Sequence, residues 1–356
     1  MSLDLKEFVS FNVSCLYIFG YLSPEFKKSS RTKTYYGIYF VLFWGFTYVL
    51  CLASQIADMV AVFGDIEKMT ETSFLLLTNT NQALKIYVFM FNGPRVRRLI
   101  KSLEREEFQP KTRVQYETIV EEIKIRPGES IRLPLSGWYP FDTNGSPIFE
   151  LVYFYQIFAT WINGMGNITM DTFLSGCIMI ISSQLAVLNE AFRIIKLEQD
   201  DFDGIQQKQN STKTLVRNIR LYKNIIQFAD EMTALFSVSI TSQFAVSVII
   251  ICMTMFQMSL VSPVSLQFLS MLLYQACILL EIFLWCYYGN EVIVQSEKLT
   301  ESAYTCEWID APKEFKQNLL FFMTRTQFPL KLYAGGYFTL SLTTYMAVCV
   351  FYVCFH

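Results

Sequence analysis

Long apolar stretches separated by shorter polar segments are the main pattern along this chain. A helix that crosses the hydrocarbon core of a membrane needs about 20 largely apolar residues. Six stretches approach or exceed that length, and each contains at most one charged residue. They cover residues 34–57, 72–94, 151–188, 233–258, 267–290 and 333–355. The pattern predicts an all-α protein, a polytopic transmembrane helical bundle that forms one domain over residues 1–356.

Composition agrees with this fold class and argues against an enzyme. Hydrophobic residues make up 53% of the chain and charged residues only 17%, whereas soluble domains carry roughly 25% charged residues. The single histidine is His356, and the nine cysteines show no metal-ligand spacing. We therefore expect no catalytic residues, no cofactor and no bound metal, and no feature suggests a nucleic-acid partner.

The distribution of basic residues predicts the orientation of the chain in the membrane. Cytoplasmic loops carry an excess of Lys and Arg. Four basic residues lie within residues 27–33, the segment 58–71 is mainly acidic, and residues 95–113 are strongly basic. This order predicts a cytoplasmic N-terminus, and it argues against a G-protein-coupled receptor, which needs its N-terminus outside.

The same rule creates a conflict in the middle of the chain. Residues 193–223 are basic as well, so an even number of crossings must separate them from residues 95–113. Only one apolar stretch, 151–188, lies between them. Either this stretch crosses twice, turning near Gly164 and Gly166, or one crossing is missing.

Three single charges interrupt the apolar stretches: Lys85, Asp171 and Glu281. Ionisable residues inside a membrane are candidates for function. Lys85 could instead extend its ammonium to the cytoplasmic surface, and Asp171 could lie at a span end or pair with another helix. Glu281 falls in mid-span, which favours a polar contact in the interior or a structural hydrogen bond.

Two segments near the C-terminus have distinct patterns. Asp310 can cap a helix that has Pro312 in its first turn, and we expect an anchor helix on the cytoplasmic side over residues 310–328. The last stretch contains four hydroxyl side chains that could face water, or could bond back to carbonyls of the preceding turn. They are Thr339, Ser341, Thr343 and Thr344.

Three quoted segments carry a family resemblance. They read "CYYGNEVIVQSEKLTESAYTCEW" at 286–308, "FKQNLLFFMTRTQFPLKLYAGGYFTLSLTTY" at 315–345 and "LPLSGWYPFDTNGSPIFELVYFYQ" at 133–156. Together they resemble the insect odorant receptors, as a tuning receptor rather than the shared co-receptor. Gustatory receptors are relatives, but only half of their usual ending is present, with Thr344 and Tyr345 followed by Phe351 and Tyr352.

The resemblance implies a function and a set of site residues. Members of that family have seven helices and form odorant-gated cation channels, as heterotetramers with a co-receptor, in the plasma membrane of olfactory sensory neurons. The ligand would be a small volatile odorant, and the last helix, with Thr339, Ser341, Thr343 and Thr344, would line the pore. We expect the ligand-binding residues to be Leu77, Asn81, Tyr153, Gln156, Trp161, Met271 and Tyr274.

The chain departs from the family pattern at two places. The interval where a third helix is expected, residues 113–132, carries several charges, each costing about 2.5–3.5 kcal/mol at the centre of a span. We therefore predict that the third helix is missing, which would keep residues 133–150 and the glycosylation sequon at Asn144 on the cytoplasmic side and would prevent an odorant-evoked current. The chain also stops several residues before the usual ending. A transporter, the third function class, would show inverted repeats, and we find none.

Overall fold

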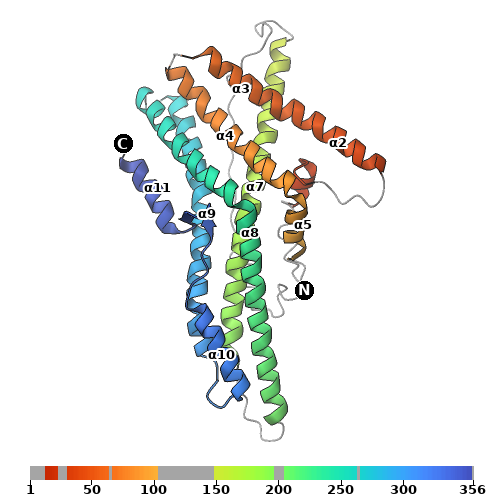
Figure 1. Ribbon diagram of the computed structural model, residues 1–356. Coiled ribbons are helices and arrows are strands. Elements are labelled where there is room, and N and C mark those ends of the chain that lie inside the picture. The colour runs from red at the N-terminus through yellow and green to blue at the C-terminus, as the bar shows by residue number, and fades with distance from the viewer. Residues whose placement is uncertain are drawn as a thin grey trace.

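A computed structural model describes residues 13–22, 30–63, 66–102, 148–195, 204–262 and 265–354. These residues form an elongated bundle of helices (Figure 1). The first helices are α2 (Ser30–Trp44), the π-helical segment η1 (Gly45–Val49), α3 (Leu50–Ala61), α4 (Ile66–Phe91) and α5 (Gly93–Ser102). They are followed by α7 (Ile148–Arg193), α8 (Gly204–Leu260), α9 (Leu266–Tyr304), α10 (Lys313–Thr326) and α11 (Leu342–Cys354).

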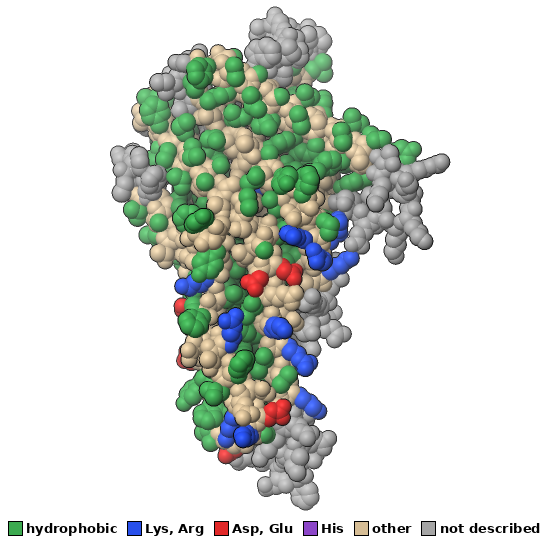
Figure 2. Space-filling model, in the orientation of Figure 1, with side chains coloured by type: hydrophobic (Ala, Val, Ile, Leu, Met, Phe, Trp, Pro, Cys, Tyr) green, Lys and Arg blue, Asp and Glu red, His purple; other side chains and the backbone are tan. Residues whose placement is uncertain are grey.

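Three long helices, α7, α8 and α9, run along the length of the bundle. They contain 46, 57 and 39 residues, and a helix of about 20 residues already crosses a hydrocarbon core. Hydrophobic side chains dominate the upper half of the molecule, and Lys, Arg, Asp and Glu gather over the lower half (Figure 2). The long helices therefore continue from an apolar half into a charged half, which is the arrangement expected where helices leave a membrane.

Within the described residues, four helices are long and apolar enough to cross a membrane. They cover residues 35–61, 154–193, 211–260 and 267–304, and each overlaps one of the six predicted spans. The predicted stretch 72–94 corresponds to most of α4, which has 26 residues. The sixth, 333–355, differs from the prediction.

That last stretch is not one helix but a β-hairpin followed by a shorter helix. Strands β1 (Tyr333–Ala334) and β2 (Phe338–Thr339) pair antiparallel, and α11 begins only at Leu342. Gly335 and Gly336 adopt φ values of 60° and 76°, a conformation that glycine tolerates without strain. The backbone N–H of Tyr337 closes the turn by donating to the carbonyl of Ala334 at 3.1 Å. The two glycines thus end the extended segment and delay the helix.

The course of α7 decides one of the two alternatives that the charge pattern raised, namely whether the stretch 151–188 crosses the membrane twice. α7 is a single helix through Gly164 and Gly166, so it crosses once and does not turn there. It begins at the upper end of the bundle, whereas α5 lies near mid-height (Figure 1). The predicted absence of the third helix itself, and Asn144, fall on residues 103–147, outside the described residues.

The anchor helix is shorter than the predicted 310–328. α10 begins at Lys313, and its cap position is taken by Pro312 rather than Asp310, without a side-chain cap. Because Pro has no N–H to leave unsatisfied, it suits the start of a helix. Its buried residues are Phe315, Leu319, Phe322 and Thr326. The ring of Phe322 packs on Phe192 of α7 and Tyr222 of α8, with centroids 4.7 and 5.3 Å apart.

Candidate ligand-binding site

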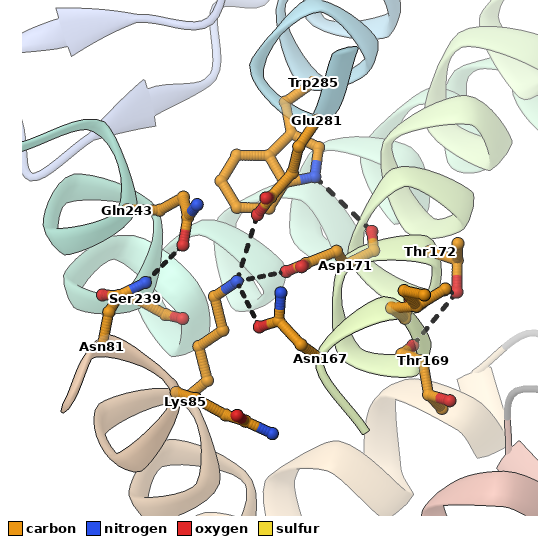
Figure 3. A network of polar contacts seen from close by, with 12 residues as sticks. Asn81, Lys85, Asn167, Thr169, Asp171, Thr172, Ser239, Gln243, Glu281 and Trp285 are labelled. Atoms are coloured by element: carbon orange, nitrogen blue, oxygen red, sulfur yellow. Dashed lines mark hydrogen bonds and ion pairs between the residues drawn. The ribbon is translucent and has the colours of Figure 1, made fainter. Parts of the chain in front are cut away.

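The three single charges of the apolar stretches meet at one point between α4, α7 and α9. The Nζ atom of Lys85 lies 2.6 Å from Oδ1 of Asp171 and 3.1 Å from Oε1 of Glu281. It also donates to Oδ1 of Asn167 at 3.1 Å (Figure 3). The side chain of Lys85 is only 2% exposed, so it does not extend to the membrane surface. Asp171 and Glu281 instead pair with it across helices.

This ion cluster is anchored on a fourth side chain, Trp285. Its ring centroid lies 5.7 Å from the ammonium of Lys85, and its Nε1–H donates to the backbone carbonyl of Asp171 at 3.5 Å. A buried charge without partners is very costly, and removing one member of a buried pair leaves the other uncompensated. Removing Lys85 alone would therefore leave two uncompensated carboxylates between the helices.

A cavity of about 330 Å³ lies beside the cluster, between α4, α7, α8 and α9. Its residues on α7, α8 and α9 all fall within the candidate membrane spans. Asp171, Glu281 and Trp285 form part of its wall, whereas Lys85 does not. The remaining wall residues are Thr78, Asn81, Asn167, Ile168, Thr172, Ser175, Gln243, Val246, Ile250, Tyr274, Cys277, Ile278, Leu280 and Leu284. The cavity is thus largely apolar with a few convergent polar groups, as small-molecule sites are.

A second polar group connects α4 to α8 at the edge of the cavity. The side-chain amide of Asn81 donates to Oε1 of Gln243, and the hydroxyl of Ser242 donates to Oδ1 of Asn81 at 2.7 Å. The Gln243 amide in turn donates to the hydroxyl of Ser247 at 3.3 Å. Between α4 and α9, the hydroxyls of Thr78 and Tyr274 lie 2.5 Å apart. Two polar contacts therefore fix the position of α4 against its neighbours around the empty space.

The structure brings two of the seven predicted ligand residues, Asn81 and Tyr274, to the cavity wall. Leu77 packs against the core, and Gln156 and Met271 are buried, but these three are not part of the wall. Trp161 is 60% exposed, and the side chain of Tyr153 lies outside the described residues.

Sequence reasoning missed the polar wall formed by Asn167, Asp171, Gln243, Glu281 and Trp285. The available sequence signal was one cation and two anions within apolar stretches. Because each such charge needs a partner in lipid, the three could have been predicted to pair with one another.

Hydrogen bonds at the start of α11 involve two of the four predicted pore hydroxyls, those of Ser341 and Thr344. The Oγ atom of Ser341, which is buried, accepts from the backbone N–H of Thr344 at 3.4 Å. The hydroxyl of Thr344 donates to the carbonyl of Thr339 at 2.6 Å. Thr343 is exposed. Within this chain the hydroxyls of Ser341 and Thr344 thus serve the junction between hairpin and helix.

Below the cavity, the C-terminal segment packs closely on α8 and α9. A Cβ atom added to Gly289 would lie 2.4 Å from the carbonyl oxygen of Leu340, so the two backbones touch directly. The hydroxyl of Ser296 accepts from the backbone N–H of Leu330 at 2.8 Å. The backbone N–H of Gly335 donates to the hydroxyl of Ser237 at 2.9 Å.

Long apolar helices around a buried, ligand-sized cavity define a polytopic membrane protein of the receptor type. Residues 116–353 match the family model described as 7tm Odorant receptor, and the chain belongs to this family. Odorant receptor 46a, isoform A, of Drosophila melanogaster is 24% identical, over 83% of this chain and 82% of its own length. Odorant receptor Or1 of Anopheles gambiae is 22% identical, over 97% of this chain and 93% of its own length.

Solved structures agree on the fold. The olfactory receptor OR5 of Machilis hrabei in complex with eugenol superposes with a TM-score of 0.79 at 16% identity, covering 99% of this chain and 97% of that one. A second structure of the same receptor, which is 17% identical to this chain, superposes with the same TM-score of 0.79. At this identity the likeness establishes the architecture, and the chemistry of the cavity comes from this chain's own residues.

Proposed function

We propose that this chain is the odorant-binding subunit of a heteromeric, ligand-gated cation channel. Its partner would be the family's co-receptor subunit, and its location the plasma membrane of olfactory sensory neurons. The observation that carries the proposal is the cavity of about 330 Å³ among the membrane-spanning helices. Pockets for small ligands begin at about 300 Å³ and are mostly apolar, so this volume suits a small volatile molecule. The eugenol complex of OR5 supports a ligand of that kind.

A route from the cavity to the proposed pore runs along α9. This helix carries Tyr274 and Glu281 at the cavity and, two turns below Glu281, Gly289 against Leu340. A ligand that shifts α9 would therefore move the hairpin and the start of α11. Thr339, Ser341, Thr343 and Thr344 remain the proposed pore lining, and Thr343 is the strongest candidate because its side chain is exposed in the single subunit.

The decisive experiment records odorant-evoked current from cells that express this chain together with the co-receptor. A current would support the proposed channel subunit and would count against the predicted loss of the third helix. Surface-expressed protein without any current, across a broad odorant panel, would instead support the predicted loss of the third helix. Tyr274→Ala should shift the concentration response, while Trp161→Ala, on an exposed side chain, serves as the control. The same comparison on Tyr153→Ala tests its predicted ligand contact.

The alternative of a G-protein-coupled receptor differs in orientation. We propose a cytoplasmic N-terminus because basic residues cluster at 27–33 and 95–113. A glycosylation tag placed at the N-terminus should remain unmodified. Modification of that tag would reject the channel topology. A gustatory-type channel shares this orientation, and tastant-evoked current without the olfactory co-receptor would favour it.

A further inference from the structure

The cavity has an unbalanced charge. With both carboxylates ionised, Lys85, Asp171 and Glu281 together carry a formal charge of −1, and the two carboxylates belong to the cavity wall while Lys85 does not. Among the described residues that line the cavity, Asp171 and Glu281 are the charged ones. A ligand in this cavity therefore meets negative charge that the protein itself compensates only in part.

Hydrogen-bonding capacity points in the same direction. An ammonium group has three donors, and Lys85 directs its Nζ to three acceptors, on Asn167, Asp171 and Glu281. Lys85 thus has no donor left for a ligand. Each carboxylate has a second oxygen that these contacts with Lys85 do not use. The cluster offers a ligand acceptors and negative charge rather than donors and positive charge.

We propose that the preferred ligand is a small amine in its protonated form, with an apolar tail. This inference rests on the proposed function of the cavity as an odorant site. The ammonium head would bind the carboxylates of Asp171 and Glu281 through charge-assisted hydrogen bonds, which are stronger than neutral ones. The rings of Tyr274 and Trp285 in the same wall favour a cation as well. The tail would lie on the apolar side chains of Val246, Ile250, Ile278 and Leu284.

The proposal predicts a ranking among probes of one carbon skeleton. Hexylamine, 1-hexanol and hexanoic acid have similar size and differ in the charge of the head group. In cells that express this chain with the co-receptor, hexylamine should activate at concentrations at least about 10-fold lower than 1-hexanol. Hexanoic acid should be weakest, because its carboxylate would add negative charge to a site that already has an excess. A response to the alcohol or the acid equal to that of the amine would overturn the proposal.

A charge-neutral substitution sharpens the test. Glu281→Gln keeps the shape of the side chain and removes its charge, so it should raise the half-maximal concentration of hexylamine by about 10-fold or more while changing that of 1-hexanol by less than about 3-fold. The matched control is Glu231→Gln, on an exposed carboxylate of α8 that bonds only within its helix to Gln227 at 2.9 Å. The control should leave both responses unchanged. A parallel loss for both probes in Glu281→Gln would overturn the proposal.

A readout without gating separates this inference from the proposed function. Purified protein should show a larger rise in melting temperature with hexylamine than with 1-hexanol, because a ligand that binds the folded state stabilises it. If Glu281→Gln does not reach the surface, the ranking of the three probes on the unmodified chain decides. Activation by neutral odorants only would reject the amine preference and leave the odorant receptor in place. Surface-expressed protein that neither conducts nor gains stability with any probe would reject both.

Discussion

The two junctions of this bundle are built in opposite ways. Around the cavity, α4, α7, α8 and α9 meet through side chains, with the Lys85 cluster on one side and the Asn81–Gln243 contact on the other. At the hairpin, the chain meets α8 and α9 through its backbone, with Gly289 against Leu340 and Gly335 against Ser237 and Thr241. Side-chain contacts around open space can rearrange when a ligand enters, whereas backbone contacts without space move as a unit. The upper junction is thus suited to sense, and the lower one to transmit.

The strongest way to break the upper junction is to remove its only cation. Lys85→Met should destabilise the folded chain by about 3–5 kcal/mol, because two buried carboxylates lose their partner. The melting temperature of the purified protein measures this. The triple variant Lys85→Met, Asp171→Asn, Glu281→Gln removes every charge and should recover most of the loss. A single variant that melts like the parent would show that the cluster does not hold the helices.

The lower junction is tested at its closest backbone approach. Gly289→Ala places a Cβ 2.4 Å from the carbonyl oxygen of Leu340 and should cost about 1–3 kcal/mol through overpacking. The odorant-evoked current should fall more steeply than the amount of surface protein, because α9 and the hairpin no longer fit. Gly164→Ala is the matched control, since its added Cβ meets nothing within 4 Å and alanine favours a helix. Equal behaviour of the two variants would contradict a close contact at Gly289.

Substitutions of the two glycines in the hairpin turn can distinguish the cost of backbone strain from the cost of steric crowding. Gly335 and Gly336 both have positive φ, and an alanine there should cost about 1–2 kcal/mol. Only Gly335 also meets a neighbour, with an added Cβ 2.5 Å from Oγ1 of Thr241. Gly335→Ala should therefore lower the melting temperature more than Gly336→Ala. Combining Gly335→Ala with Thr241→Ala should remove the excess, and no recovery would show that crowding is not its cause.

The mildest change probes a single hydrogen bond at the cavity. Tyr274→Phe removes the hydroxyl that contacts Thr78 and keeps the ring. We expect the half-maximal odorant concentration to shift by about 2- to 10-fold, in line with roughly 0.5–1.5 kcal/mol for one hydrogen bond. Concentration–response curves measure the shift, and Trp161→Phe should leave them unchanged. A shift of equal size in the control would mean that Tyr274 does not act through the cavity.

Much of the architecture could be predicted from the apolar stretches, because lipid requires long uncharged helices. The last predicted span failed at its start, since an uncharged run cannot distinguish a hairpin from a helix, and the conformation of Gly335 and Gly336 decides there. The cap of α10 was placed two residues early, at Asp310 instead of Pro312. Local propensity does not determine whether Asp310 or Pro312 becomes the cap, because the packing of Phe315 also affects where the helix begins.

The site was predicted less well than the fold. Lys85, Asp171 and Glu281 were each recognised as unusual, but their meeting depends on the rotation of three helices, which a single sequence does not specify. Asn81 and Tyr274 lie at the cavity wall, and their contact with a ligand stays a prediction. Trp161 is 60% exposed, and since aromatic residues occur both at pockets and at lipid-facing surfaces, its ligand contact stays a prediction.

The uninterrupted course of α7 gives the molecule a mechanical property. Its 46 residues form a rod about 69 Å long at 1.5 Å per residue, and Asp171 lies at its midpoint. The ion cluster therefore lies at a point about which α7 could pivot, with about the same length of helix on either side. A tilt of about 5° around Asp171 would move each end by about 3 Å, since each arm measures about 34 Å. A small tilt of α7 at the cavity would thus displace Phe192 and the helices packed around it at the far end.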